Sequence, residues 1–191
     1  VVEDRPEGGF ASLVQGWFAW QESLPASDTR KRAASTITEN AREAANLVKA
    51  WGHFQVSEIT RSMAYEYLDA CLQATDKNGK LRPRPEKGNK EISLARLVLE
   101  YGIRKGLLEA NPLDKVTKNK TAKDKRYVTN EEMDLAVEIG RKFGGARLIV
   151  ALALRTAWLC VRRSVEVRAL QRDAIKDTGI LWQDGKNRRK P

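Results

Sequence analysis

The stretch Phe10-Ala11-Ser12-Leu13-Val14-Gln15-Gly16-Trp17-Phe18 carries the pattern on which the fold depends. Its large apolar residues recur at i, i+3, i+4, i+7 and i+8, which is the spacing of one helix face. Similar stripes return downstream, within Ile37–Trp51, Met63–Cys71 and Ile92–Ile103. Four amphipathic helices of this kind can bury their apolar faces against one another. Residues 10–114 are therefore expected to form a helical domain.

Residues with capping and turn preferences predict where these helices begin and end. Ser27 or Thr29 is expected to cap the second helix, and Gly52 is expected to end it. Thr60 is expected to cap the third helix. The segment Asp76–Asn89 contains an Asn-Gly pair and two prolines, which indicates a polar loop before the fourth helix.

The second part of the chain has a different pattern. Thr129 and Glu132 have the spacing of a capping box that opens a fifth helix, and Gly144-Gly145 ends that helix. The stretch Ala146–Val161 is apolar on nearly all sides, which predicts a buried central helix. A short helix is expected over Ser164–Leu170.

The composition excludes several classes of protein. The 191 residues are 41% hydrophobic, which is enough for the cores of one or two domains and too much for a wholly disordered chain. The longest apolar run, Leu148–Leu154, is far shorter than the roughly 20 residues of a membrane span. No secretory signal is visible, and Cys71 and Cys160 have neither disulfide-framework nor metal-site spacing. We expect a reduced, cytoplasmic protein without a cofactor, and, because Val1 replaces an initiator methionine, a fragment.

The net charge of +10 is unevenly distributed. The chain has 16 basic and 16 acidic residues up to Asp114, whereas 19 basic and 9 acidic residues follow it. Much of the excess lies in residues 115–126, which are expected to form an extended basic linker. Two further clusters are Arg30-Lys31-Arg32 and the cations of residues 77–96. Clustered cations favour a polyphosphate partner over a surface that is basic only for solubility. The expected phosphate contacts are Arg30, Lys31, Arg32, Arg84, Lys87, Lys90, Lys118, Lys120, Lys123 and Lys125.

Another group of residues suggests chemistry. Arg162-Arg163 precede Glu166 by about one helical turn, so the carboxylate can hold a guanidinium that grips a phosphate. Lys186 follows a predicted strand at Ile180-Leu181-Trp182 and a hairpin turn at Asp184-Gly185, where it can donate a proton to a leaving alkoxide. A surface Arg–Glu pair followed by a basic tail explains the same spacing equally well. No Walker loop, dinucleotide-binding turn or nucleophile elbow occurs in the sequence.

The run Arg163-Ser164-Val165-Glu166-Val167-Arg168-Ala169-Leu170 resembles the first catalytic box of the tyrosine recombinases, the phage integrases. Upstream, Glu100–Leu107 and Asn111-Pro112 are similar to the end of that family's core-binding domain. Arg126-Tyr127-Val128-Thr129 is similar to the family's domain junction. The resemblance covers nearly the whole chain from Phe10 onward.

The resemblance implies a mainly α fold. It would consist of a four-helix SAM-like core-binding domain followed by a partial α+β tyrosine-recombinase catalytic domain. The expected boundaries are residues 1–9 for an N-terminal extension, 10–114 for the core-binding domain, 115–126 for the basic linker and 127–191 for the truncated catalytic domain.

The same resemblance implies roles for individual residues. Arg163 would clamp the scissile phosphate, Glu166 would support it, and Lys186 would be the general acid on the leaving 5′ oxygen. Arg162 is a rival for the clamp. The sequence has no His-x-x-Arg box and no tyrosine after Tyr127, so it is expected to bind double-stranded DNA without cleaving it. The complete enzyme would need no metal and would act as a tetramer on DNA, nucleoid-associated in the cytoplasm of a bacterium or phage-infected host.

Two other functions remain open. A non-enzymatic DNA-binding module, or an integrase relic that occupies sites without cleaving them, would show the same cationic clusters. An RNA-binding or ribosome-associated basic protein is a third possibility, which competition between duplex DNA and structured RNA would separate from the others.

Overall fold

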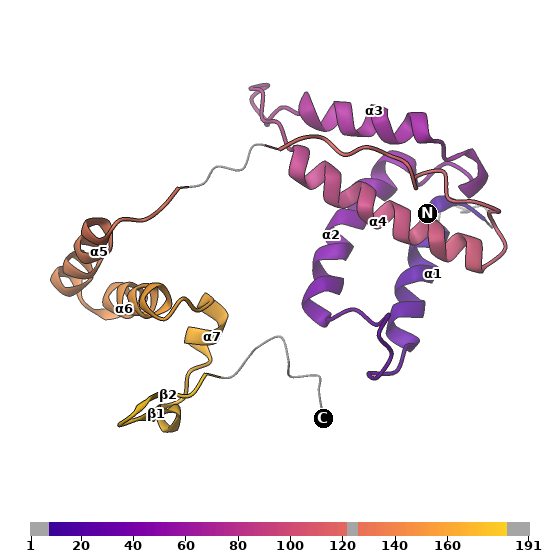
Figure 1. Cartoon of the computed structure of the whole chain (residues 1–191). Coiled ribbons are helices and arrows are strands. Elements are labelled where there is room, and N and C mark those ends of the chain that lie inside the picture. Colours follow the sequence, from indigo (N-terminus) through magenta and orange to yellow (C-terminus); the bar gives the residue numbers. More distant parts are fainter. Residues whose placement is uncertain (1–7, 122–125, 183–191) are drawn as a thin grey trace. The chain divides into compact units, whose positions relative to one another are not determined.

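The computed structural model describes residues 8–121 and 126–182, and the protein is 61% helical (Figure 1). The prediction of a mainly α chain is therefore confirmed. The chain forms two compact units, Val1–Lys123 and Asp124–Pro191, here called the first unit and the second unit. None of the helices in the described ranges combines the length and the apolar character needed to cross a membrane.

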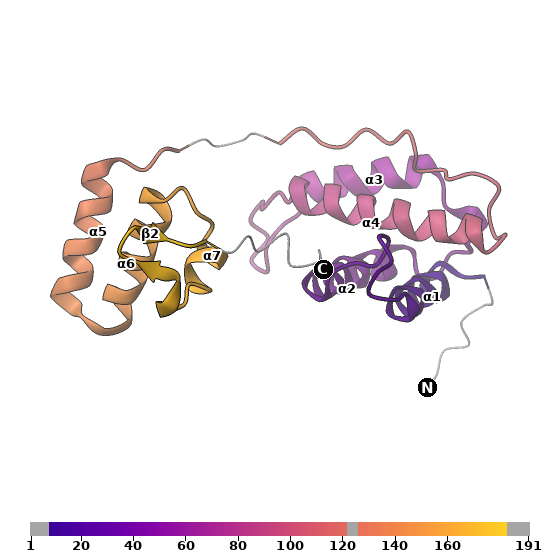
Figure 2. The same cartoon turned by 60° about the horizontal axis from the view of Figure 1, so that its bottom comes forward.

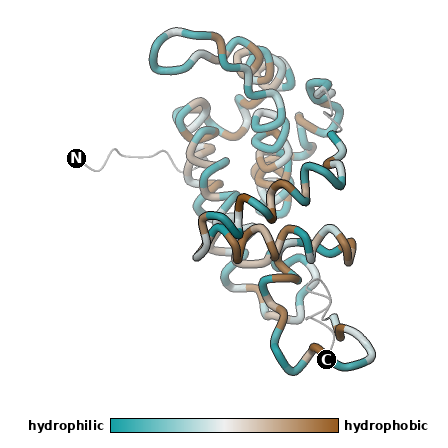
Figure 3. The backbone as a smooth tube through the Cα atoms, turned by 90° about the vertical axis from the view of Figure 1, so that its left-hand side faces the viewer, coloured by the Kyte–Doolittle hydropathy of each residue, from teal (hydrophilic) through white to brown (hydrophobic). Residues whose placement is uncertain are grey.

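The first unit is a bundle of four α-helices among its described residues. Its elements are α1 (Phe10–Ser23), α2 (Ala34–Trp51), a short 3-10 helix (Val56–Glu58), α3 (Arg61–Leu72) and α4 (Pro85–Arg104). α4 packs against the other three helices, and Figure 2 shows α3 on one side of it and the α1–α2 pair on the other. The largest fully buried side chains include Phe10, Trp17, Leu47, Leu68 and Leu99. They come from all four stretches predicted to be amphipathic helices, and Figure 3 shows hydrophobic and hydrophilic residues alternating along the helices.

Three predicted helix ends are confirmed, because each depends on local chemistry. Thr60 caps α3, and its Oγ1 accepts a hydrogen bond from the Met63 N–H at 3.3 Å. Gly52 directly follows the last residue of α2. Thr129 and Glu132 form the predicted capping box, in which each side chain accepts a hydrogen bond from the other residue's backbone N–H.

The predicted start of the second helix is wrong. α2 begins at Ala34, well after Ser27 and Thr29. The cause is a turn at Asp28, whose Oδ1 accepts a hydrogen bond from the Arg30 N–H at 2.8 Å. Such a side-chain contact stabilises a turn in competition with a helix. The basic cluster that follows Asp28 therefore lies in the loop before α2 and not in its first turn.

The predicted loop Asp76–Asn89 is too long at its C-terminal end. α4 begins at Pro85, because proline is well accommodated at the first position of a helix. Gly88 is buried in α4, so close to α3 that a Cβ at this position would lie 2.8 Å from the Cys71 Sγ. A proline and a glycine that look like loop residues therefore belong to the central helix.

The second unit is smaller and less enclosed in its described part. Its elements are α5 (Asn130–Phe143), α6 (Gly145–Leu159), α7 (Ser164–Arg168), a 3-10 helix (Arg172–Ala174), β1 (Ile175–Lys176) and β2 (Gly179–Ile180). α6 packs against α5 and α7, and the two strands pair antiparallel with Ile175 opposite Ile180. Of the strand predicted at residues 180–182, Ile180 lies in β2, whereas Leu181 and Trp182 lie outside it. The turn predicted at Asp184-Gly185 lies outside the described residues.

The helix predicted over residues 146–161 is present as α6, but the prediction that it is buried is wrong. Ala151 is the buried residue of α6, whereas Ile149, Leu154 and Leu159 are exposed. α5 covers the face that carries Ala151, and a Cβ added at Gly140 of α5 would lie 2.9 Å from the Ala151 Cβ. Within the described residues, α5 and α7 pack against α6 and leave much of its apolar surface exposed.

Part of the predicted basic linker packs along the first unit (Figure 1). The Asn119 N–H donates to the Asn89 Oδ1 at 2.9 Å, and the Asn119 Nδ2 donates to the Leu68 carbonyl at 3.0 Å. Val116 packs against the hydrophobic core. The segment that begins at Lys115 is therefore fixed to α3 and α4 as far as Asn119, and its lysines extend the charged surface of this unit.

Candidate nucleic-acid interface

The first unit carries a basic recess at the start of α4, here called the α3–α4 recess. It has a volume of about 750 Å³ and is formed by the loop before α4, the first turn of α4 and the segment around Lys120. Its cationic residues are Lys77, Arg82, Arg84, Lys87 and Lys120, and its acidic residues are Asp76 and Glu86. The fold therefore brings together three of the expected phosphate contacts, namely Arg84, Lys87 and Lys120.

Asp76 organises the loop that forms one wall of the α3–α4 recess. Its Oδ1 accepts hydrogen bonds from the N–H groups of Asn78 at 2.8 Å and Lys80 at 3.0 Å. Gly79 has a φ of +76°, which glycine adopts without strain. The turn indicated by the Asn-Gly pair is therefore present, and it presents Lys77 at the edge of the recess.

A buried carboxylate, Glu91, holds Arg84 in place and accepts hydrogen bonds from three side chains. Glu91 of α4 is 2% exposed, and it accepts a hydrogen bond from the Arg84 Nη1 at 2.9 Å. It also accepts one from the Tyr67 hydroxyl of α3 at 2.8 Å and one from the Asn46 Nδ2 of α2 at 2.6 Å. Buried charges require such partners. Arg84, expected to contact phosphate, therefore neutralises a charge inside the fold.

The network raises the pKa values of Tyr67 and Arg84. Burial, followed by the hydrogen bond to Glu91, raises the pKa of Tyr67 above its usual range. Burial opposes the charged form of Arg84, but its hydrogen bonds to Glu91 and Tyr67 outweigh burial and raise its pKa. A signal for this network exists in the sequence: Glu91 lies four positions before Ala95 and eight before Leu99, on the apolar stripe of the helix.

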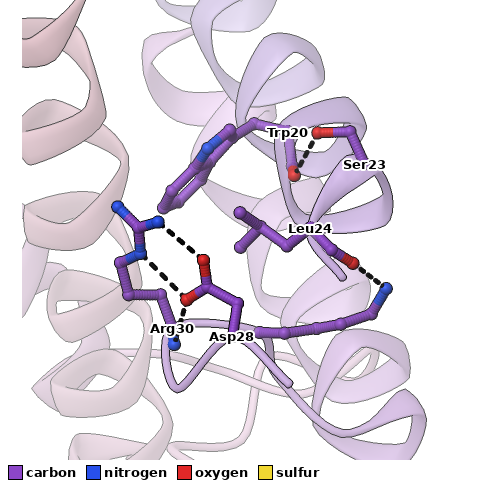
Figure 4. A network of polar contacts seen from close by, with 6 residues as sticks. Trp20, Ser23, Leu24, Asp28 and Arg30 are labelled. Atoms are coloured by element: carbon purple, nitrogen blue, oxygen red, sulfur yellow. Dashed lines mark hydrogen bonds and ion pairs between the residues drawn. The ribbon is translucent and has the colours of Figure 1, made fainter. Parts of the chain in front are cut away.

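Arg30 is also engaged within the fold. Figure 4 shows its guanidinium facing the Asp28 carboxylate beside Trp20, with an Nε–Oδ1 distance of 2.9 Å and an Nη2–Oδ2 distance of 2.6 Å. These hydrogen bonds lower the pKa of Asp28 to about 2. Two of the donors that Arg30 could offer to a phosphate are thus already used.

Lys31 has a structural partner as well. Its Nζ donates hydrogen bonds to the backbone carbonyls of Leu24 and, at 3.3 Å, of Glu22. These carbonyls lie at the C-terminus of α1, where a lysine satisfies unpaired acceptors and complements the helix dipole. The contact explains why the cluster lies beside the end of α1.

A second basic recess, here called the α1–α4 recess, lies between the end of α1, the loop before α2 and the last turns of α4. Its volume is about 480 Å³. Its cationic lining residues are Arg30, Lys31, Arg32 and Arg104, its acidic residue is Glu100, and its aromatic residues are Trp17, Trp20 and Tyr101. The Arg104 guanidinium lies 5.2 Å from the centroid of the Trp20 ring, and the Arg32 guanidinium lies 5.9 Å from that of Trp17. Arg104 was not among the expected contacts, because its partner Trp20 is distant in the sequence.

In the second unit, Glu166 lies next to both candidate catalytic arginines at the start of α7. The Arg163 N–H donates to the Glu166 Oε2 at 3.2 Å, and the Arg163 Nη1 lies 3.3 Å from the Glu166 Oε1. The Arg162 Nη1 lies 4.0 Å from the Glu166 Oε2, and its guanidinium lies 5.3 Å from the centroid of the Trp182 ring. The Glu166 side chain is 6% exposed and the Arg163 side chain is 64% exposed. A buried carboxylate thus positions a guanidinium that faces solvent.

The other expected site residues are distributed as follows. Lys90 and Lys118 are exposed on the first unit. Lys123, Lys125 and Lys186 lie outside the described residues. A smaller recess of about 250 Å³ lies beside Glu166 and is also lined by Lys176, Leu181 and Trp182. Lys176, on β1, lines this recess and was not among the site residues expected from the sequence.

Neither a metal centre nor a known relative defines the site. In residues 8–121 and 126–182, no three His, Cys, Asp or Glu side chains form a group that could hold a metal ion. Comparison of the chain with protein-family models, with curated proteins and with solved structures finds no match. The basis for a functional conclusion is therefore the geometry of the two recesses and of the Arg163–Glu166 pair.

Proposed function

We propose that the chain is the DNA-binding part of a tyrosine recombinase of the phage-integrase type. In this proposal the first unit is the core-binding domain and the second unit is the beginning of the catalytic domain. The observation that supports it best is the Arg163–Glu166 arrangement, in which a buried carboxylate holds an exposed guanidinium. An arginine fixed in this way is suited to binding a phosphate through paired N–H donors.

The proposed chemistry is phosphoryl transfer between DNA and a tyrosine. The tyrosine hydroxyl attacks the scissile phosphorus, a phosphotyrosine bond forms, and the bond to the 5′ oxygen of the next nucleotide breaks. Arg163 neutralises the charge on the non-bridging oxygens, and Glu166 keeps its guanidinium in place. Lys186 is proposed to protonate the leaving oxygen. The attacking tyrosine of this proposal is not one of the 191 residues, because no tyrosine follows Tyr127 in the sequence.

The two basic recesses of the first unit support the DNA-binding part of the proposal. Both are lined by several cations from separate segments of the chain, and Lys120, next to the segment that packs on α3 and α4, lines one of them. Contacts of this kind position a protein on the phosphate backbone without reading sequence. Affinity is then expected to fall steeply as salt concentration rises.

One inexpensive experiment separates the recombinase from a non-enzymatic DNA-binding module. The reading frame that follows the codon for Pro191 is expected to encode a His-x-x-Arg box and, after it, a tyrosine. A stop codon at this point would contradict the recombinase and would favour the module or relic.

A second experiment tests the assignment of the nucleophile. The 191-residue chain is incubated with a nicked suicide duplex and analysed on a denaturing gel. No covalent protein–DNA adduct is expected, because Tyr127 lies outside the position of the family's nucleophile. An adduct that disappears in a Tyr127→Phe variant would show that this residue attacks DNA and would overturn the assignment.

A further inference from the structure

We infer that Arg162 is a positioning residue, which fastens the β1–β2 hairpin to the start of α7 and leaves Arg163 as the arginine that binds phosphate. This inference rests on the proposed function and deepens it, because the sequence leaves Arg162 and Arg163 as rivals for the same role. Its basis is the backbone at Val161, the contact between Arg162 and Trp182, and the small size of the hairpin.

A strained turn at the end of α6 directs the two arginines. The Arg162 N–H donates to the Ala157 carbonyl at 2.8 Å, and the Val161 N–H donates to the Trp158 carbonyl at 3.3 Å. This hydrogen-bond pattern ends a helix with one residue in the left-handed conformation, which is usually glycine. Val161 occupies that position with a φ of +51°, which strains a β-branched residue. Its side chain is 91% exposed, so its own packing does not offset the strain. The contacts of the residues that follow the turn must therefore offset it.

Arg162 is held from two sides directly after this turn. Its guanidinium lies 5.3 Å from the centroid of the Trp182 ring, and its Nη1 lies 4.0 Å from the Glu166 Oε2. A guanidinium over an indole ring makes an attractive cation–π contact, which strengthens where water is partly excluded. The Arg162 side chain is 35% exposed, compared with 64% for Arg163. Arg163 is therefore the more accessible of the two to a phosphate.

The hairpin needs such a contact because it is small. β1 and β2 contain two residues each, and neither strand has a buried residue. A two-stranded hairpin is marginally stable by itself in water. The Leu181 N–H donates to the Ala174 carbonyl at 2.9 Å, directly before Trp182. The contact between Trp182 and Arg162 therefore fixes the end of the hairpin beside Glu166.

A fixed hairpin completes the recess beside Glu166. Glu166 comes from α7, whereas Lys176 and Trp182 come from the hairpin and the residues after it, and all three line this recess. Lys176 adds a positive charge to the surroundings of the phosphate proposed at Arg163. Loss of the contact between Arg162 and Trp182 is therefore expected to weaken phosphate binding at Arg163, although neither residue binds the phosphate.

Nuclear magnetic resonance of the ¹⁵N-labelled full chain can follow the two arginines separately. Their Nε–H resonances are assigned from their absence in Arg162→Gln and Arg163→Gln, and the protein is titrated with inorganic phosphate at constant ionic strength. We expect a saturable shift of the Arg163 resonance and almost no shift of the Arg162 resonance. Arg162→Gln and Trp182→Ala are each expected to raise the Kd at Arg163 about two- to fivefold, which is the effect of one exposed cation–π contact. The double variant is expected to raise it no further, because both substitutions remove the same contact.

Two further variants separate this contact from other effects. Trp182→Phe keeps an aromatic ring and is expected to retain most of the affinity that Trp182→Ala loses. Arg168→Gln is the matched control, because Arg168 is an exposed cation of α7 that does not line the recess. It is expected to retain the wild-type Kd.

Hydrogen exchange of the Leu181 amide tests the hairpin directly. Arg162→Gln and Trp182→Ala are each expected to accelerate this exchange about two- to fivefold. Unchanged exchange in α5 shows that the variants are folded. Val161→Gly keeps the turn and removes its strain, so we expect wild-type exchange at Leu181 and a higher Tm. A lower Tm would contradict the strained turn.

Each possible failure has a distinct meaning. No response of either arginine to phosphate would overturn the proposed phosphate site itself. A response of the Arg162 resonance would overturn the division of roles and leave the phosphate site intact. If Arg163 responds, but Arg162→Gln changes neither its Kd nor the exchange of Leu181, the positioning role of Arg162 is wrong. An equal rise in Kd for Arg168→Gln would show that only the loss of a charge matters, and would overturn that role as well.

Discussion

Glu91 is the residue on which the organisation of the first unit depends most. It is a carboxylate on the buried face of the central helix, and its three hydrogen-bond donors come from three different segments of the chain. Removing one partner of a buried ion pair typically costs about 3–5 kcal/mol, because the remaining charge is left without compensation. The network therefore fixes how α2, α3 and the start of α4 meet, and with them one wall of the α3–α4 recess.

The Tyr67→Phe variant tests this network. It removes a donor to Glu91 and is expected to lower the free energy of unfolding by about 1–2 kcal/mol. The folded-state pKa of Tyr67 is raised, so its contribution is fully present below a pH of about 10 and declines as pH rises beyond it, where the unfolded chain ionises first. Urea unfolding of both proteins at neutral and alkaline pH should show the difference between them shrinking above pH 10. A difference in the free energy of unfolding that does not change with pH would contradict a raised pKa of Tyr67 in the folded protein.

Lys31 provides a second prediction for a single residue. Lys31→Met keeps the aliphatic part of the side chain and removes the Nζ that donates to the Leu24 and Glu22 carbonyls. We expect a loss of about 0.5–1 kcal/mol in the free energy of unfolding. Lys49→Met, a substitution of an exposed lysine of α2, is the control and should change stability less. If Lys31→Met weakens DNA binding strongly without changing stability, Lys31 serves the ligand and not α1.

At the scale of elements, the crossing of α3 and α4 depends on a missing side chain. Gly88→Ala would place a methyl group 2.8 Å from the Cys71 Sγ and 3.0 Å from the Cys71 Cβ. Overpacking of this kind costs about 1–3 kcal/mol, although alanine is the better helix former. Gly16→Ala is the control, since its Cβ would meet Tyr101 at an ordinary 3.4 Å. Thermal unfolding should show a lower Tm for Gly88→Ala alone, with partial recovery when Cys71→Ala is added. Equal Tm values for the two glycine variants would contradict the packing described.

Helices could be predicted from the sequence where their signals are local. The apolar stripes of the first unit and the caps at Thr60 and Thr129 need only neighbouring residues, and they agree with the structure. The start of α2 could not be predicted in this way, because the turn at Asp28 competes with the cap at Ser27 or Thr29. Pro85 and Gly88 were also ambiguous, since proline suits a loop as well as the first position of a helix, and the place of Gly88 depends on packing against α3.

At the scale of the whole molecule, the net charge of +10 is a weaker guide to function than the partners of each cation. The sequence indicates which segments are basic, and the α3–α4 recess does gather several of the expected contacts. The sequence could not show that Arg84 is paired with Glu91, because this pairing depends on the fold. Conversely, Arg104 joins the candidate interface only through its contact with Trp20.

The second unit shows the same limitation for apolar residues. Its apolar stretch over residues 146–161 is indistinguishable in sequence from a helix at the centre of a core. Whether such a helix is buried depends on the elements that cover it, and in the described residues α5 covers one face. The spacing of Arg163 and Glu166 was a more reliable guide, because an i, i+3 pair at a helix start meets through local geometry alone.

The central claim is that this chain binds duplex DNA through its phosphate backbone. The most direct test is an anisotropy titration of a fluorescein-labelled 30-base-pair duplex with the unmodified chain at 50 and at 200 mM KCl. We expect binding at 50 mM and a rise in Kd of about 100-fold at 200 mM, as roughly four phosphate contacts would produce. No binding at 50 mM, or a Kd that changes less than about twofold between the two salt concentrations, would contradict the claim.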